Sequence, residues 1–240
     1  MQTKDIEYHA DGARLVGRLF VDETRSGKRP GVLVAPEGLG LSDHTFNIAG
    51  RLAEAGYVAF AMDYYGDGAQ VAMEDVMPRI GAFMANPQTT IRARAAEALK
   101  VLAAQPETDA GKLAAIGFCF GGTTALELAR GGADLKAVVG FHSGLGTSRP
   151  QDAANIKAKV LVCIGADDPI IPPDQRAAFE KEMTDGKVDW RINLYGGAGH
   201  SFTNPAVDAL GRPGFAYHAP TDRRSWAAML DLFGEAFGPH

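Results

Sequence analysis

The segment 117–122, Gly-Phe-Cys-Phe-Gly-Gly, places a cysteine between an apolar run and the start of a helical pattern. A strand that turns abruptly into a helix presents the central side chain at the turn, and it needs glycine on both sides because larger residues would collide. Cys119 would then stand at a helix N-terminus, where the helix dipole favours a thiolate. The motif predicts a nucleophilic cysteine. A buried, unreactive thiol in a glycine-rich turn is the alternative interpretation.

A cysteine nucleophile needs a base, and the base needs an orienting carboxylate. His200 follows the last predicted strand in a glycine-rich loop, and two aspartates follow the strand before it. The chain order is therefore nucleophile, acid, histidine, which is one of the orders in which such triads occur. We predict Asp168 as the acid because the prolines after it would stiffen the loop that carries the carboxylate. Asp167 is the alternative.

The remaining histidines and the second cysteine have other expected places. His142 lies near a strand end but precedes both aspartates, so we expect it to line the cleft. Cys163 lies in the middle of an apolar strand, which predicts a core position. We expect surface or helix positions for the other histidines, which are His9, His44, His218 and His240.

The loop after the first buried strand reads Glu37-Gly38-Leu39-Gly40. In hydrolases with this strand-to-helix turn, such a loop supplies one backbone N–H to the oxyanion hole, and the residue after the nucleophile supplies the other. We therefore predict an oxyanion hole formed by the N–H groups of Gly38 and Phe120. Glu37 follows a buried run and is expected at the edge of the site, where it could accept the thiol proton. A solvated turn carboxylate is the alternative.

The elements that must position these residues follow from hydrophobic patterning. Residues 5–21 predict two alternating strands around a tight turn at Asp11-Gly12. Apolar or alternating runs predict strands at 31–36, 57–64, 112–118, 136–143, 159–165 and 191–197. Helical periods predict helices at 44–55, 90–104, 122–130 and 221–237. This alternation predicts one α/β domain over 1–240, with a mostly parallel sheet, helices on both faces and an antiparallel N-terminal hairpin. Residues 66–90 receive no assignment.

Composition limits the possible classes of protein. The chain has 240 residues, 46% of them hydrophobic and 22% charged, and a net charge of -5, which argues against disorder and against a nucleic-acid partner. Two cysteines provide neither a disulfide framework nor a Cys-based metal site. The N-terminus lacks a signal-peptide pattern, and no apolar run reaches the roughly 18 residues of a membrane span. We expect a cytoplasmic protein without a membrane partner, and the missing P-loop, dinucleotide and zinc motifs predict no metal or cofactor.

Four motifs together resemble the dienelactone hydrolase family, and the resemblance extends from about residue 11 to 237. The motifs are Glu37-Gly38-Leu39-Gly40, the segment 117–122, Gly165-Ala166-Asp167-Asp168 and Ala198-Gly199-His200-Ser201-Phe202. The resemblance implies an α/β-hydrolase fold and a Cys119–His200–Asp168 hydrolase that acts on lactones or esters. It also implies that Glu37 interacts with the resting thiol until substrate frees it.

One position departs from the family pattern. Family members hold a substrate carboxylate with arginines, one of them four residues beyond the catalytic histidine, where this chain has Asn204. Arg79 lies in the region where the other arginine would fall. We expect Asn204, Arg79 and His142 to contribute to the substrate pocket. The loss of one arginine favours a neutral or differently shaped ester over the family's dienelactone.

These observations predict a cofactor-free hydrolase of carboxylic esters or lactones, of the carboxymethylenebutenolidase type, that works through a thioester on Cys119. Its partner would be a small-molecule substrate, and the chain would be a monomer or a homodimer. A promiscuous esterase or thioesterase with the same triad is one alternative. A non-catalytic small-molecule binder or thiol sensor on the same scaffold is another.

Overall fold

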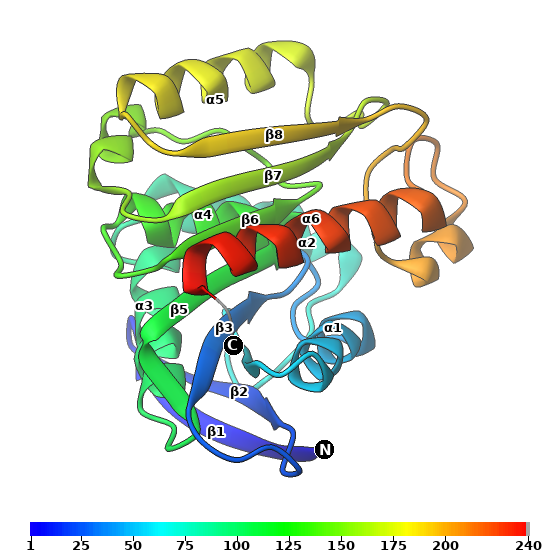
Figure 1. The fold of residues 1–240 in the computed structure, drawn as a ribbon. Coiled ribbons are helices and arrows are strands. Elements are labelled where there is room, and N and C mark those ends of the chain that lie inside the picture. The colour runs from blue at the N-terminus through cyan, green and yellow to red at the C-terminus, as the bar shows by residue number, and fades with distance from the viewer. Residues whose placement is uncertain (239–240) are drawn as a thin grey trace.

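Eight strands form one sheet in the order β1-β2-β4-β3-β5-β6-β7-β8 (Figure 1). The computed structural model describes residues 1–238, so the position expected for His240 lies outside the described residues. The strands are β1 (Gln2–Ala10), β2 (Ala13–Val21), β3 (Arg29–Ala35), β4 (Val58–Ala61), β5 (Thr108–Phe118), β6 (Ala137–Phe141), β7 (Lys159–Gly165) and β8 (Trp190–Tyr195). Every strand expected from the sequence is present, although β4 is shorter than predicted.

The N-terminal hairpin forms the edge of the sheet. β1 and β2 pair antiparallel around Asp11 and Gly12, whose φ angles are 51° and 70°, as a tight hairpin turn requires. β2 pairs antiparallel with β4, and all further pairings from β4 to β8 are parallel. The expected mostly parallel sheet with an antiparallel hairpin is confirmed.

Helices cover both faces of this sheet (Figure 1). The helices are α1 (Asp43–Glu54), α2 (Met73–Ala85), α3 (Ile91–Ala103), α4 (Phe120–Arg130), α5 (Pro173–Asp185) and α6 (Ala219–Phe237), with short 3-10 helices η1 (Pro150–Asn155) and η2 (Pro205–Leu210). One core contains Ile91, Leu126 and Phe179 from α3, α4 and α5. The opposite core contains Ile48 of α1 and Phe233 of α6. None of the helices within residues 1–238 has both the length and the apolar character needed to cross a membrane.

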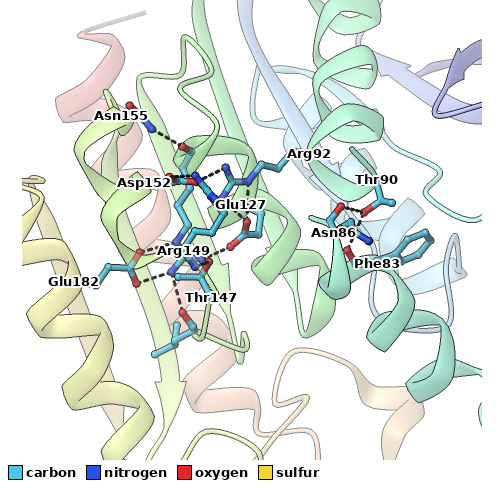
Figure 2. Close-up of polar contacts among 12 residues, drawn as sticks. Phe83, Asn86, Thr90, Arg92, Glu127, Thr147, Arg149, Asp152, Asn155 and Glu182 are labelled. Atoms are coloured by element: carbon cyan, nitrogen blue, oxygen red, sulfur yellow. Dashed lines mark hydrogen bonds and ion pairs between the residues drawn. The ribbon is translucent and has the colours of Figure 1, made fainter. Parts of the chain in front are cut away.

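A buried network of ion pairs connects α4 to α3, α5 and η1 (Figure 2). Arg130, whose side chain is fully buried, bonds Glu182 of α5 at 2.7 Å and Glu127 at 2.9 Å. Arg92 of α3 bonds Glu127 at 2.8 Å and Asp152 of η1 at 2.7 Å. Three carboxylates thus share two buried guanidinium groups, and these contacts fix the helix that begins at the strand-to-helix turn.

Candidate active site

The predicted strand-to-helix turn is present between β5 and α4. Cys119 has φ 52° and ψ -118°, a strained conformation for a residue with a side chain. A Cβ added to Gly117 would lie 2.0 Å from the carbonyl oxygen of Gly121, and one added to Gly121 would lie 2.1 Å from that of Ala35. Glycine is therefore required on both sides of the turn. Cys119 is partly exposed, whereas the second cysteine, Cys163, is buried.

His200 and Asp168 lie together at the carboxyl edge of the sheet. Nδ1 of His200 is 2.8 Å from Oδ2 of Asp168, and both side chains are buried. The other carboxylate oxygen of Asp168 accepts a 2.8 Å hydrogen bond from the Ile170 amide. Asp167 is exposed. Of the two aspartates weighed from the sequence, Asp168 is the one in contact with the imidazole.

The charge state of His200 depends on two neighbours. Burial disfavours the imidazolium, but the hydrogen bonds and negative charges of Asp168 and Cys119 outweigh burial and raise the pKa of His200 to about 10. The thiol of Cys119 therefore lies close enough to the imidazole to influence its protonation. A protonated imidazole in this place stabilises negative charge on the sulfur.

Two free backbone donors lie at the turn, one in the loop after β3 and one in the first residue of α4. In the part of the chain that the structure describes, residues 1–238, the amide N–H groups of Gly38 and Phe120 donate to no protein acceptor. Gly38 is buried, and a Cβ added there would lie 2.8 Å from Val76 of α2. A side chain at position 38 would therefore require the Val76 side chain to shift.

Glu37 faces Asn204. Its Oε2 accepts a 2.6 Å hydrogen bond from Nδ2 of Asn204. Burial raises the pKa of Glu37, and the Asn204 bond, the charge of His200 and a bond with Ser201 offset this effect only in part. Among the hydrogen bonds of residues 1–238, none joins Glu37 to the Cys119 thiol. The carboxyl group is hydrogen-bonded to Asn204, and its interaction with the resting thiol stays a prediction.

His142 occupies a different place from the one expected. It is fully buried, so it does not form an open wall of the cleft, and its φ is 41°. Its Nδ1 is 3.2 Å from the backbone nitrogen of Cys119, whose N–H is shared with the Phe141 carbonyl oxygen at 3.0 Å. The Nε2 of His142 is 2.9 Å from Oγ1 of Thr203. Because an N–H group only donates, we assign Nδ1 of His142 as the acceptor and Nε2 as the protonated nitrogen. Burial and then the charges of His200 and His44 hold the pKa of His142 well below its usual value.

This chain of contacts continues to a histidine for which no sequence motif predicts a place at the site. Oγ1 of Thr203 is also 3.3 Å from Nε2 of His44, which lies at the start of α1. The helix position expected for His44 is confirmed, but the residue is partly buried and joined to the site. His9 is exposed on β1, and His218 immediately precedes α6. Cys163 is fully buried in β7, as expected, and burial raises its pKa to about 12.

The aromatic ring of Phe215 contacts the imidazole of His200. The ring of Phe215 packs against the His200 imidazole with centroids 5.0 Å apart, and the guanidinium of Arg212 lies 4.0 Å from the Phe215 ring centre. Arg79 is exposed on α2, with its guanidinium 5.7 Å from the ring centre of Tyr65. No sequence pattern indicates Phe215 or Arg212, because both lie in the loop between η2 and α6 rather than at a strand end.

Comparison with known proteins identifies close relatives. The chain matches the Dienelactone hydrolase family over residues 16–237. A solved structure named m3DLH is 49% identical, covers 98% of each chain and has a TM-score of 0.94. The structure of a dienelactone hydrolase-like promiscuous phosphotriesterase from metagenomic libraries is 43% identical, again over 98% of each chain, with a TM-score of 0.93.

A curated relative from Yersinia pestis, named "Putative carboxymethylenebutenolidase", is 28% identical over 236 residues, which are 93% of this chain and 85% of the relative. The family match and the strand order also confirm the expected α/β-hydrolase fold. This chain is a hydrolase and belongs to the dienelactone hydrolase family.

Proposed function

We propose that this hydrolase cleaves carboxylic esters and lactones of small molecules through a thioester formed on Cys119. The sulfur attacks the acyl carbon while the carbonyl electrons move to the oxygen. When the C–O bond breaks, His200 gives its proton to the leaving alcohol. The neutral imidazole then takes a proton from water, the resulting hydroxide attacks the thioester, and the sulfur leaves.

One observation carries this proposal: a partly exposed cysteine at a strained turn is close enough to His200 to raise its pKa, and Nδ1 of that histidine is 2.8 Å from a buried carboxylate. Asp168 would orient the imidazole and stabilise its positive charge. After acylation the sulfur no longer carries negative charge, so the contributions of Cys119 to the His200 pKa disappear. A falling pKa suits the second half of the reaction, which needs a neutral base.

The free N–H groups of Gly38 and Phe120 support an oxyanion hole. The tetrahedral intermediate places a negative charge on the former carbonyl oxygen, and preorganised backbone donors stabilise it without reorganisation. In related sites, each donor of this kind lowers the activation free energy by about 2.7–4 kcal/mol.

The substrate that fits this site best is neutral. Glu37 and Asn204 are joined at 2.6 Å, so a substrate carboxylate placed there would meet a carboxyl group and a neutral amide. An arginine in the place of Asn204 would add about 1.5–3 kcal/mol of binding for such a carboxylate. We therefore propose neutral esters and lactones in preference to a carboxylate-bearing dienelactone.

A panel of neutral aryl esters, lactones, acyl thioesters and a dienelactone tests the proposal on wild type, Cys119→Ala and Cys163→Ala. The second variant is the matched control because Cys163 is the other cysteine of the chain and is buried in β7. We expect Cys163→Ala to keep turnover and Cys119→Ala to lose it. Full ester turnover by Cys119→Ala would exclude the mechanism. Reactive Cys119 without turnover of any substrate by wild type would indicate a thiol sensor.

Neutral phosphotriesters are a second candidate class of substrate. The observation that favours them is the 43% identity to a relative described as a promiscuous phosphotriesterase. The same thiolate would attack phosphorus, and the same N–H groups would face the phosphoryl oxygen. An aryl dialkyl phosphotriester, assayed on wild type and Cys119→Ala, tests this activity through release of the phenolate.

A further inference from the structure

We propose that Tyr64 is a positioning residue for the oxyanion hole, because its hydroxyl holds the peptide unit whose N–H belongs to Gly38. The inference rests on the proposed function, which gives that N–H its role. Tyr64 itself touches no reacting atom. It acts through the direction and the polarity of one backbone amide.

The geometry of a single peptide unit carries the inference. The Tyr64 hydroxyl donates to the carbonyl oxygen of Glu37 and shares this bond with the carbonyl oxygen of Pro36, 3.2 Å away. The Glu37 carbonyl oxygen also accepts a 2.9 Å hydrogen bond from the Gly40 amide, so the hydroxyl acts together with a turn of the loop itself. The carbonyl of Glu37 and the N–H of Gly38 belong to the same peptide plane. In a trans peptide these two groups point in opposite directions. A hydroxyl that fixes the carbonyl on one side therefore fixes the N–H on the other.

The same contact also strengthens the donor. A hydrogen bond to the carbonyl oxygen draws electron density through the amide, and chains of hydrogen bonds polarise one another in a low-dielectric interior. The Gly38 N–H should consequently be a better donor to a developing oxyanion than an amide whose carbonyl faces water.

Tyr64 is suited to this task because it is immobile and stays protonated. Its side chain is fully buried, and burial raises its pKa well above the usual value of 10.0. Its ring packs against Tyr65 and Phe120 with centroids 4.7 Å and 5.4 Å apart. Arg94 donates a 2.7 Å hydrogen bond to its backbone carbonyl. The hydroxyl therefore stays a donor at pH values at which an exposed tyrosine begins to ionise.

The segment before and after Tyr64 is fixed by a buried carboxylate. Asp63 is 2% exposed, and its two oxygens accept hydrogen bonds from four backbone amides. These amides belong to Tyr65 at 2.8 Å, Gly66 at 3.0 Å, Val16 at 3.1 Å and Gly68 at 2.8 Å. A tyrosine held at both ends by such contacts can determine the orientation of a loop that lies 27 residues earlier in the chain.

Tyr65 provides a matched control within the same loop. Its hydroxyl donates a 2.6 Å hydrogen bond to the carbonyl oxygen of Gly38. That carbonyl belongs to the next peptide unit, whose N–H is on Leu39 and has no part in the proposed oxyanion hole. Removing either hydroxyl takes one donor from the same loop, but only the Tyr64 hydroxyl acts on the peptide that contains the Gly38 N–H.

The test compares Tyr64→Phe with Tyr65→Phe. Both variants keep the ring, and circular dichroism with thermal unfolding verifies their folding. For a neutral aryl ester we expect Tyr64→Phe to lower kcat by about 10-fold to 100-fold, less than the 10²–10³ for removal of a donor, because the N–H is displaced rather than lost. KM should change by less than about twofold, since the interaction strengthens only in the transition state. Tyr65→Phe should lower kcat by less than about threefold.

A second readout separates this role from damage to the nucleophile. Iodoacetamide alkylates Cys119 by displacement at a saturated carbon, a reaction that forms no oxyanion. We expect its rate to be the same within about twofold in wild type and both variants. A trifluoromethyl ketone, which binds as a charged thiohemiketal, should bind more weakly to Tyr64→Phe and unchanged to Tyr65→Phe.

Equal effects of the two substitutions on kcat, or a parallel loss of alkylation in Tyr64→Phe, would overturn the role of Tyr64. The failure of the proposed function has a different signature, which is ester turnover by Cys119→Ala. If Cys119→Ala is inactive but the two tyrosine variants have equal kcat values, only the positioning role of Tyr64 is contradicted.

Discussion

The side-chain amide of Asn204 donates a 2.6 Å hydrogen bond to the Glu37 carboxyl group. The contact joins the loop after β3 to the loop that carries His200, although the two residues are 167 positions apart. Neither group is a cation, so this contact offers an anionic substrate no opposite charge. The charge of the substrate is therefore the property that position 204 should control most strongly.

Substitution Asn204→Arg should create affinity for a substrate carboxylate. We expect KM for a carboxylate-bearing lactone to fall by about tenfold, the low end for a charge-assisted hydrogen bond, because Glu37 competes for the guanidinium. KM for a neutral ester should not fall. Steady-state kinetics on both substrates measure the effect, with Asn204→Ala as the control that removes the amide without adding charge. The same gain in Asn204→Ala would show that charge at position 204 is not the cause.

Thr203 links His142 to His44, and this link should help to hold the Cys119 backbone. Thr203→Val keeps the shape but removes the hydroxyl, so the Nε2–H of His142 loses its acceptor, at a cost of about 1–3 kcal/mol. We expect kcat for ester hydrolysis to fall by about tenfold in Thr203→Val and to recover in Thr203→Ser. Kinetics together with thermal unfolding distinguish the two variants. Equal kcat in Thr203→Val and wild type would exclude a role for this chain of contacts in catalysis.

The raised pKa of His200 predicts the alkaline limit of acylation. The imidazolium is the favoured form below pH of about 10, and its proton is needed by an alkoxide leaving group. For an alkyl ester, kcat/KM should therefore fall as the pH rises through about 10. For a nitrophenyl ester, kcat/KM should fall less, because the nitrophenolate leaving group needs no proton.

Asp168→Asn provides the control for this pH profile. It removes the carboxylate whose hydrogen bond and charge raise the His200 pKa, so the alkaline limb should move to lower pH. The profile is measured on enzyme whose folding is verified at each pH by circular dichroism. An alkaline limb at the same pH in Asp168→Asn and wild type would show that His200 does not set it.

The buried ion pairs behind α4 should contribute to stability. Arg130→Met leaves Glu127 and Glu182 without a common partner, and we expect the free energy of unfolding to fall by about 3–5 kcal/mol. The matched control is Lys181→Met, because Lys181 forms an exposed pair with Asp185 at 2.6 Å, which should contribute less than about 1 kcal/mol. Urea unfolding curves of both variants measure the difference. Similar losses in the two variants would contradict the role of the network.

The strands and most helices could be predicted because their buried residues form continuous apolar runs or recur at helical spacing. β7 is a continuous apolar run since it is buried on both faces, and α6 repeats its apolar residues at helical spacing. α5 was missed because only Phe179, Glu182 and Met183 of its 13 residues are buried, which leaves no apolar stripe. α2 was missed because it has no buried residue and contains Pro78, a residue typical of loops and helix ends.

The candidate site was predictable as far as strand ends determine it. Cys119, Asp168 and His200 follow three strands whose carboxyl ends lie on one edge of the sheet, and topology brings such residues together. The place of His142 depends on a φ of 41° at that residue. The contact of Tyr64 with the loop after β3 depends on how two loops pack. Neither feature leaves a periodic or spacing signal in the sequence.

The central claim is that the acyl group of the substrate is carried by the Cys119 sulfur, and peptide mass mapping of acid-quenched enzyme tests it most directly. Enzyme is mixed with a slowly hydrolysed aryl ester, quenched, digested and analysed. The account predicts that the mass of one acyl group appears on the peptide containing Cys119, that it is released by hydroxylamine as expected for a thioester, and that it is absent in Cys119→Ala. An enzyme that turns over this ester while the acyl group is found on another residue would contradict the account.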